Sequence, residues 1–371
     1  MEQVFENKRD CCGCGACAHR CPAGAIAMEP DEEGFLYPVV RAERCMDCGL
    51  CQTICPFRKE DHWKNEQMPQ FYVAKHRDEE VLCRSTSGGA FTALSDQVLD
   101  MGGAVYGAVF DSRFRVVHQR ATGRAGRDRM RFSKYVQSDL GNCFCQVEQD
   151  LRQGKPVLFT GTPCQNAGLR AAMGPLAEQG PLVCCDLICY GVPSPRVWEA
   201  YKQLLEKEQG APLAEVSFRT KELPWSRSNS NRSFRYRTAN QREGQADQRF
   251  YRLFFESGAI LRPSCGQCPF ASACRASDLT IADYWGIEKY APEEYDPLGV
   301  SLVLTSTERG RRLLEQCPSL WTEARPAEES LAEQKRLHQP AELPENRPLF
   351  WDTLEKEGLE AACNAVLDPL E

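Results

Sequence analysis

Long hydrophobic runs are missing from this sequence. No stretch of the 371 residues approaches the ~18 apolar residues that a membrane helix needs, and the opening MEQVFENKRD lacks the apolar stretch of a signal peptide. We therefore expect a cytoplasmic protein without a membrane span. An excess of positive charge is also missing: the net charge of −7 argues against nucleic acid as the main partner. No GxGxxG follows a strand, which argues against a nicotinamide site of that kind.

Cysteine, in contrast, is abundant. The chain has 21 cysteines, and disulfides are rare in the reducing compartment that we expect for it. The cysteines are therefore candidate metal ligands or redox groups. The chain is also long enough for two or three domains with an ample core, so it is no cysteine-stapled miniature.

Eight cysteines near the N-terminus form two runs with the same spacing, C-x2-C-x2-C-x3-C followed by proline. The runs are Cys11, Cys14, Cys17 and Cys21 before Pro22, and Cys45, Cys48, Cys51 and Cys55 before Pro56. This spacing is typical of two-cluster [4Fe-4S] ferredoxins, in which the fourth cysteine of each run binds the other cluster. We therefore predict that Cys21 serves the second cluster and Cys55 the first. A zinc pair would use paired CxxC motifs separated by longer loops. Cys12 lies outside the pattern and is interpreted as a spectator.

The remaining sequence predicts a mixed α/β sheet with helices packed on it. Strand-like runs alternate with amphipathic helices, as in AVYGAVFD, PVLF, PLVCCDLI and VSLVLT. We predict four segments: a two-cluster ferredoxin-type domain at 1–57, a charged linker at 58–70, an oxidoreductase domain at 71–325 and a C-terminal helical extension at 326–371. Apart from the two cysteine runs there is no internal repeat.

Three loops contain candidate functional residues. STSGG precedes a helix whose free amides could hold a phosphate, although a glycine turn before a helix is more often only a turn. In KPVLFTGTPCQ a buried strand ends at Thr160–Cys164, where ligands collect in α/β sheets. PLVCCDLICYG repeats that layout and places Cys189 in a similar loop.

A third group of cysteines follows in CGQCPFASACRASDLTIADYWG, which contains Cys265, Cys268 and Cys274. The loops of Cys164 and Cys189 could supply further ligands. We favour a third [4Fe-4S] cluster over a structural zinc with the same ligands, and over thiols that bind no metal.

The motifs STSGGAF, KYVQS, GTPCQ, DLICYGVPSP and CGQCPF...RASDLTIADYWG resemble the coenzyme F420 hydrogenase/dehydrogenase beta-subunit family over roughly residues 70–300. Members bind FAD beside a [4Fe-4S] cluster, so the resemblance implies a flavin. By motif, Ser87, Gly88 and Gly89 would line the flavin phosphates, Lys134 would lie near the isoalloxazine ring, and Thr160, Gly161, Thr162, Pro163 and Gln165 would pass along its edge.

The same resemblance implies that Cys164, Cys265 and Cys268 ligate the third cluster. Many relatives read CHGVPSP where this chain has Cys189 followed by Tyr190, and many lack a cysteine matching Cys274. Cys189 is therefore the preferred fourth ligand, with Cys274 in reserve.

These observations predict an iron–sulfur flavoprotein oxidoreductase with Lys134 as its catalytic residue. It would pass electrons between a hydride donor or acceptor at FAD, such as a coenzyme F420-like or other small redox substrate, and the clusters. The alternative is a subunit that relays electrons to a protein partner without substrate chemistry, and a redox sensor is a third option. The arginine-rich segment Arg219–Arg252 could hold an anionic substrate, or it could be the solvent face of a strand.

Overall fold

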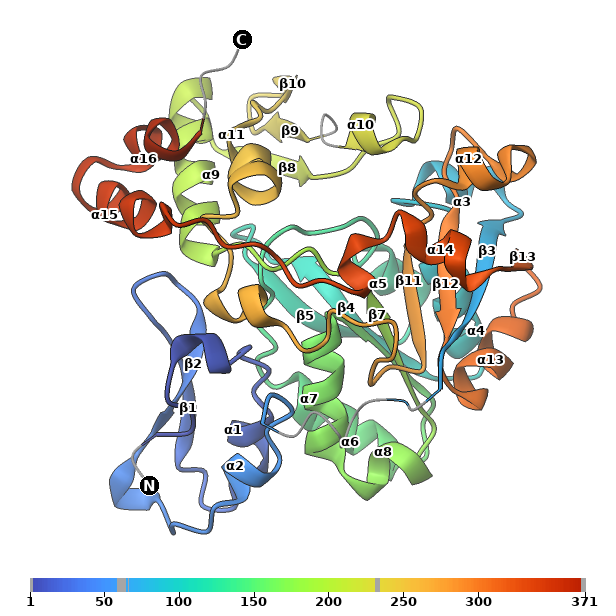
Figure 1. Ribbon diagram of the computed structural model, residues 1–371, viewed down its shortest axis with the longest axis horizontal. Helices are drawn as coiled ribbons and strands as arrows, with labels where there is room; N and C mark the ends of the chain where they lie inside the picture. The colour runs from blue at the N-terminus through green and yellow to red at the C-terminus, as the bar shows by residue number, and fades with distance from the viewer. Residues whose placement is uncertain (1–2, 59–64, 66, 231–233, 368–371) are drawn as a thin grey trace.

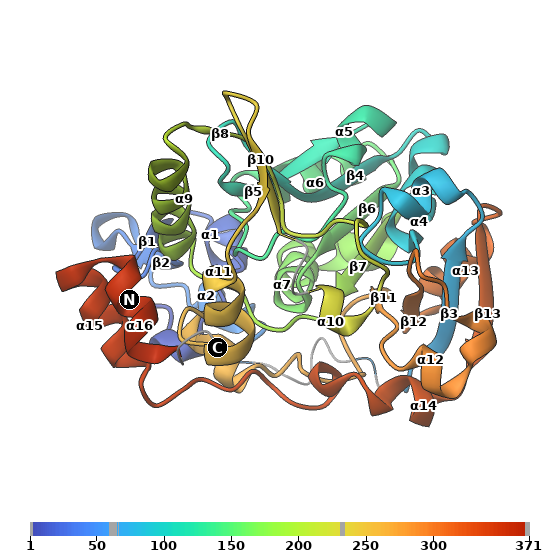
Figure 2. The same ribbon diagram turned by 90° about the horizontal axis from the view of Figure 1, so that it is seen from above.

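An eight-stranded mixed sheet forms the centre of the molecule (Figure 1). The computed structural model describes residues 3–58, 65, 67–230 and 234–367. From one edge to the other the strands are β13 (Leu320–Arg325), β3 (Gln70–His76), β12 (Ser301–Thr305), β11 (Leu279–Asp283), β7 (Leu182–Leu187), β6 (Val157–Gly161), β4 (Ala104–Phe110) and β5 (Val116–Ala121). Strands β4, β6, β7 and β11 are parallel, and the other pairings are antiparallel. Figure 2 shows the order from β5 to β13.

Helices cover both faces of this sheet. On one face lie α4 (Ala90–Asp100), α5 (Arg124–Asp128) and α13 (Glu308–Glu315); on the other lie α6 (Cys143–Arg152), α7 (Pro163–Met173), α8 (Pro175–Gln179) and, over β3, α14 (Ala327–Ala332). Leu158 packs with the residues of α4, whereas its neighbours Val157 and Phe159 pack with those of α6 and α7. Because both faces are covered at the centre of the sheet, β6 and β7 are largely continuous apolar runs, which is why they could be predicted from the sequence.

A second packed unit stands beside the sheet, around α9 (Pro195–Gln209), whose N-terminal cap is the Ser194 hydroxyl accepting from the Val197 amide at 3.1 Å. Its other elements are β8 (Leu213–Ser217), β9 (Arg235–Thr238), β10 (Glu243–Gln245), α11 (Arg249–Tyr251), the π-helix η4 (Arg252–Ser257), α15 (Arg347–Glu357) and α16 (Leu359–Val366). The C-terminal helices are part of its core, since Phe350 and Ala362 are fully buried against α9 and η4.

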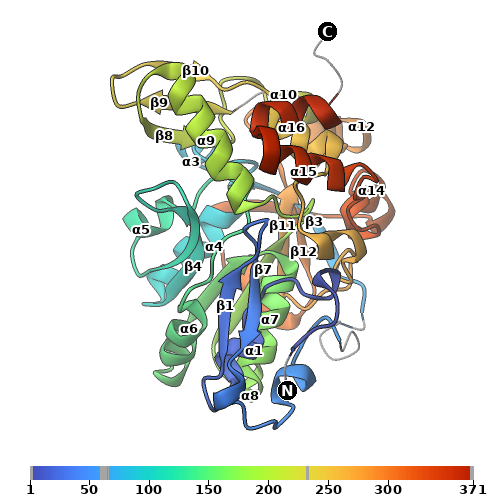
Figure 3. The ribbon, with the colours of Figure 1, turned by 90° about the vertical axis from the view of Figure 1, so that its left-hand side faces the viewer.

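The N-terminal segment is a small hairpin with short helices. It contains η1 (Lys8–Asp10), α1 (Ala16–Arg20), β1 (Ile26–Pro30), β2 (Leu36–Val40), η2 (Ala42–Arg44) and α2 (Leu50–Thr53). Both α-helices begin after a glycine in the left-handed region, Gly15 at φ 74° and Gly49 at φ 71°. Helix α1 contacts α7, and Figure 3 shows the hairpin in front of α7.

The remaining elements are short: α3 (Glu79–Cys83), α10 (Arg227–Ser230), η5 (Pro263–Gln267), α12 (Ile287–Tyr290), η6 (Pro292–Glu294) and η7 (Lys335–Leu337). The predicted linker at 58–70 falls largely outside the described residues, although Asn65 donates to the Arg275 carbonyl. Within the described ranges, no helix has the length and apolar character that crossing a membrane requires. The predicted fold, a mixed α/β sheet behind a small ferredoxin-like segment, is confirmed.

Candidate functional site

The first cysteine set is gathered around the start of α1. Cys11 and Cys14 lie on the loop that enters this helix, Cys17 lies in its first turn, and Cys55 follows the end of α2. Burial raises the pKa of Cys17, and the neighbouring sulfurs of Cys14, Cys11 and Cys55 raise it further. Burial likewise raises the pKa of Cys11 to about 11. The structure therefore brings the last cysteine of the second run to the first three of the first run.

The second set is the reciprocal one. Cys21, Cys45, Cys48 and Cys51 line one cavity between the end of α1 and the start of α2. The amide of Ala25 donates to the Cys21 sulfur at 3.2 Å, which holds this thiol toward the cavity. Cys48 is exposed, so this set borders the solvent.

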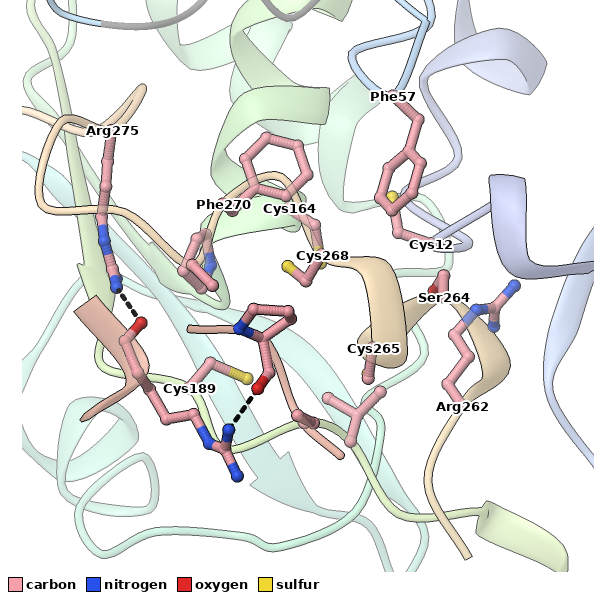
Figure 4. Close-up of a pocket in the computed structure, with 17 residues that line it drawn as sticks. Cys12, Phe57, Cys164, Cys189, Arg262, Ser264, Cys265, Cys268, Phe270 and Arg275 are labelled. Atoms are coloured by element: carbon pink, nitrogen blue, oxygen red, sulfur yellow. Dashed lines mark hydrogen bonds between the residues drawn. The ribbon is translucent and has the colours of Figure 1, made fainter. Parts of the chain in front are cut away.

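A third cavity joins cysteines from three distant segments of the chain (Figure 4). Cys164 lies in the first turn of α7, Cys189 follows β7, Cys265 lies in η5, and Cys268 comes directly after η5. Burial raises the pKa of Cys268 to about 12, and the sulfurs of Cys164 and Cys189 add to the rise. Burial also raises the pKa of Cys265, as do the sulfurs of Cys189, Cys268 and Cys164. Four half-buried thiols therefore line one cavity, and binding iron there would displace their protons.

Cys274, the reserve ligand, is not brought to this cavity. Its sulfur lies 3.8 Å from the Gln67 carbonyl oxygen and 3.8 Å from the Met68 sulfur. The following residue, Arg275, turns toward β7, where its guanidinium donates to Asp186 at 3.2 Å and to the Leu187 carbonyl at 3.0 Å. Cys189 is therefore the fourth cysteine of the set, and the buried charge of Arg275 lies beside it.

Cys12 is the residue whose position sequence reasoning missed. It lines the third cavity together with Cys164, Cys189, Cys265 and Cys268, and it also contacts Cys14 of the first set. The spacing alone indicates a spectator, because Cys12 falls outside the repeated pattern. The crowding of five cysteines into residues 11–21 is the only signal of its role in the sequence, and that signal does not reveal a contact across 152 residues of chain, from Cys12 to Cys164.

The STSGG loop lies against the sheet. The Ser87 hydroxyl donates to the Val300 carbonyl at 2.6 Å, and the Gly88 amide donates to the Ser301 hydroxyl at 2.9 Å. A Cβ on Gly88 would collide with the carbonyl oxygen of Ala74. A Cβ on Gly89 would lie 2.8 Å from His76, and its φ of 81° favours glycine. Packing on the sheet is thus sufficient reason for both glycines, and their assignment to the flavin phosphates stays a prediction.

The GTPCQ loop forms the start of α7. The Thr162 amide donates to the Gln165 side-chain oxygen at 3.0 Å in a capping box, and Pro163 occupies the first turn. The Thr160 hydroxyl donates to the Tyr106 carbonyl at 2.8 Å, and Gly161 lies against the Gln165 side chain. This loop positions Cys164 rigidly, while its proposed contact with a flavin stays a prediction.

Lys134 lies in a loop that contacts the STSGG loop. The amide of the preceding Ser133 donates to the Thr86 hydroxyl at 3.2 Å, which joins the two loops. The Lys134 ammonium donates to the carbonyls of Arg129 at 3.0 Å and Arg131 at 2.5 Å. Burial, followed by the nearby charge of Arg129, lowers the pKa of Lys134 to about 7.

The arginine-rich segment is largely paired with carboxylates. Arg235 donates to Glu222 at 2.6 Å, Arg237 pairs with Glu215, and the buried Arg219 lies 3.3 Å from Asp283. Arg232, which belongs to this segment, lies outside the described residues. These ion pairs favour a structural role for the segment over an anionic substrate site.

In the described part of the chain, no three His, Cys, Asp or Glu side chains are placed to hold a single metal ion. A [4Fe-4S] cluster makes a different demand, because its four cysteine ligands each bind a different iron and so stand farther apart than the ligands of one metal ion. The first two sets have the spacing of a two-cluster ferredoxin and lie in a segment docked on an α/β domain, while a cluster at the third set stays a prediction.

Comparison with known proteins agrees with this arrangement. The family model for the 4Fe-4S dicluster domain matches residues 10–59, and the family model for the C terminus of the coenzyme F420 hydrogenase/dehydrogenase beta subunit matches residues 154–329. Residues 154–329 therefore carry the C-terminal domain of this hydrogenase/dehydrogenase beta-subunit family, and a dicluster domain lies in front of it.

Two individual proteins were also similar. An uncharacterised ferredoxin of Methanocaldococcus jannaschii is 33% identical over 54 residues, which are 15% of this chain and 69% of the ferredoxin. A chain of the F420-reducing [NiFe] hydrogenase complex from Methanosarcina barkeri aligns with a TM-score of 0.48 and 17% identity, covering 81% of this chain and 92% of that chain.

Proposed function

We propose that this chain is an iron–sulfur flavoprotein oxidoreductase. It passes electrons between a small hydride donor or acceptor at FAD and three [4Fe-4S] clusters, two in the N-terminal segment and one on Cys164, Cys189, Cys265 and Cys268. The flavin exchanges two electrons as hydride and releases them singly, and each cubane carries one. A coenzyme F420-like deazaflavin is the substrate class that the family description suggests.

The observation that carries the proposal is the third cavity. Cys164, Cys189 and Cys265 are far apart in sequence, yet they and Cys268 converge on one buried space beside the ferredoxin segment. Cysteines that bind no metal have no reason to gather at one cavity, since a free cysteine in a core behaves only as a small hydrophobic residue. Four sulfurs around a cavity beside the buried guanidinium of Arg275 form a donor set suited to an anionic cubane.

The proposed flavin site is formed by the STSGG loop and the KYVQS loop, which contains Lys134. Two buried polar atoms there have no hydrogen-bond partner among the described residues, Arg131 Nε and Thr220 Oγ1. Arg131 adjoins the KYVQS loop, and Thr220 precedes Lys221, whose ammonium donates to the Ser87 carbonyl at 3.3 Å. A dinucleotide's phosphates would satisfy such groups, because unpaired buried donors are costly. Arg131, Thr220 and Lys221 would then hold FAD together with the predicted loops.

The test uses the full chain purified without oxygen. We expect about twelve irons, since three cubanes carry four each, and one acid-extractable FAD per chain. Mixing with reduced coenzyme F420 should bleach the flavin band first and the cluster absorbance afterwards. Replacing Thr220 by Val removes only a hydroxyl, so Thr220→Val should fold normally and bind FAD more weakly in an equilibrium titration.

The same measurements separate the enzyme from the relay. The second cysteine set borders the solvent: Met46 is 67% exposed, and Cys48 is exposed as well. A protein partner could collect electrons at this surface, which is the observation that favours a relay. A chain with about twelve irons but no flavin, reduced by a ferredoxin and by no small hydride donor, would contradict the enzyme and support the relay. About eight irons would contradict the third cluster.

A further inference from the structure

We propose that Cys12 and Arg262 form the contact through which electrons pass between the third cluster and the ferredoxin cluster of Cys11, Cys14, Cys17 and Cys55. This inference deepens the proposed function and rests on its third cluster. The transfer moves one electron: one cluster is oxidised by one unit, the other is reduced by one unit, and no bond or proton changes place. Cys12 and Arg262 bind neither cluster; they position the two sets of ligands against each other.

Cys12 lies between two cysteines of different sets. Its side chain contacts both Cys14 and Cys164, and only 6% of the residue is exposed. The Cys12 carbonyl accepts from the Gln137 side chain at 3.0 Å, which fixes the backbone at this point. In Figure 4, Cys12 stands at the side of the cavity next to Phe57, while Cys268 and Cys189 point into the cavity from other segments. One thiol therefore bridges the two sets.

Helix α7 has a glycine at the point where the ferredoxin loop packs against it. Cys164 and Gly168 are four residues apart, so they lie on one face of the helix. A Cβ on Gly168 would lie 2.5 Å from Cys14 Cβ and 2.7 Å from its sulfur, so only glycine admits the ferredoxin loop here. The helix face that carries a third-cluster cysteine is thus the face on which Cys14 packs.

Arg262 holds the same junction from the other side. It is fully buried and immediately precedes η5, the element that carries Cys265. Its guanidinium donates to the Cys11 carbonyl at 2.9 Å, to the Leu36 carbonyl at 3.0 Å and to the Gln137 side chain at 2.9 Å. The same group lies 4.1 Å from the centre of the Tyr37 ring. One side chain therefore links the third-cluster loop to both the first cysteine set and the hairpin.

The charge of Arg262 also acts on the first set. Its Nη2 lies 3.9 Å from the Cys11 sulfur, in a buried setting where charges interact strongly. A cluster gains negative charge when it is reduced, so a cation at this distance favours its reduced form and raises its potential. Arg262 also lines the third cavity, so its charge acts on both sides of the junction and favours holding an electron there. The exposed set around Cys48 is the part of the ferredoxin segment that borders solvent.

The experiment follows the order in which clusters are reduced. Oxidised full-length protein is mixed with dithionite, and rapid-freeze EPR records each cluster over time. In wild type, the exposed ferredoxin clusters are reduced first and the third cluster next. In Cys12→Ala the ferredoxin clusters should be reduced at the wild-type rate, while reduction of the third cluster should lag by about tenfold or more, comparable to the activity lost when residues that position metal ligands are removed. The matched control is Cys143→Ala, a cysteine buried in the same apolar cluster.

A wild-type rate for the third cluster in Cys12→Ala, or an equal lag in Cys143→Ala, would overturn the proposal. Loss of the third cluster in Cys12→Ala would overturn it as well, because Cys12 would then be a ligand. Failure of the underlying function looks different: wild type itself would contain about eight irons and show no third EPR signal.

Variants of Arg262 test the proposal by a second measurement, the reduction potential of each cluster, which requires no substrate turnover. In an EPR-monitored redox titration, Arg262→Met should lower the potential of the cluster at Cys11 and leave the potential of the cluster at Cys48 unchanged. Arg262→Lys retains the charge and should restore most of the potential. Arg127→Met, at a fully buried arginine paired with Asp96 on α4, is the control for loss of a buried cation. An unchanged potential in Arg262→Met would contradict the proposed role.

Discussion

At the scale of single residues, Lys134 both holds its loop together by hydrogen bonds and has a lowered pKa. Its ammonium closes the loop after α5 by donating to the carbonyls of Arg129 and Arg131. Burial, with Arg129 nearby, lowers the pKa of Lys134 to about 7, so its charge is lost within the physiological range. A cation beside a flavin stabilises the anionic reduced ring, so a lysine of this kind could make flavin reduction sensitive to pH.

We predict that reduction of the flavin by a hydride donor slows as pH rises through about 7, because Lys134 is charged below its pKa and neutral above it. Lys134→Arg keeps the charge at every working pH and should flatten the profile. Lys134→Ala should be slow throughout. Stopped-flow absorbance on both sides of pH 7 gives the rates, and reduction by dithionite through the ferredoxin clusters serves as the control. The same pH dependence in wild type and Lys134→Arg would contradict the role of this lysine.

At the scale of elements, the third cavity depends on how loops leave the strands and helices. The loop after β7 brings Cys189 inward, whereas the turn at Ser272 and Arg275 leaves Cys274 beside Met68. By spacing alone, both cysteines are plausible ligands. Their positions differ because the Arg275 guanidinium is anchored on Asp186 and the Leu187 carbonyl.

We therefore predict that Cys189→Ser removes the third cluster and Cys274→Ser does not. Serine nearly preserves the volume of cysteine but replaces the soft thiolate that iron prefers. Iron analysis should fall from about twelve to about eight in Cys189→Ser, with loss of one EPR signal, and stay at the wild-type value in Cys274→Ser. The reverse result would mean that loading the cluster rearranges the loop after Cys268.

Much of the element pattern could be predicted from the sequence because its causes are local. Buried strands such as β6 and β7 are continuous apolar runs, and α9 begins at a Ser-Pro cap. The reasons for Gly88 and for Cys12 could not be predicted, since each depends on a neighbour more than ten residues away. Gly88 faces the Ala74 carbonyl, so Gly88→Val would damage the sheet and could not report on flavin binding. Contacts across the fold follow from topology, which local patterns do not encode.

At the scale of the whole molecule, the ferredoxin segment is held at several places, among them the cysteine loop and the tip of the hairpin. Arg262 holds the cysteine loop, and the tip of the hairpin is held through Glu33, whose carboxylate accepts from both terminal nitrogens of Arg347 in α15. The Ser194 hydroxyl also donates to the Glu33 carbonyl at 2.5 Å. The C-terminal helices, which the sequence indicates only as an extension, thereby help to hold the hairpin against the rest of the chain.

This clamp leads to the last prediction. The Glu33 and Arg347 side chains are 11% and 15% exposed, so removing one partner leaves the other charge half-desolvated, at a cost on the order of 3 kcal/mol. Glu33→Gln and Arg347→Gln should each lower the temperature at which cluster absorbance is lost. Each should also speed proteolysis of the hairpin, because the hairpin is then held less firmly. The double variant should lose less than the sum of the two, because the pair acts as a unit. Asp352→Asn breaks an exposed pair with Lys356 in the same helix and should change little. If Asp352→Asn matched Arg347→Gln, or if the single variants were strictly additive, the Glu33–Arg347 pair would not be what holds the hairpin in place.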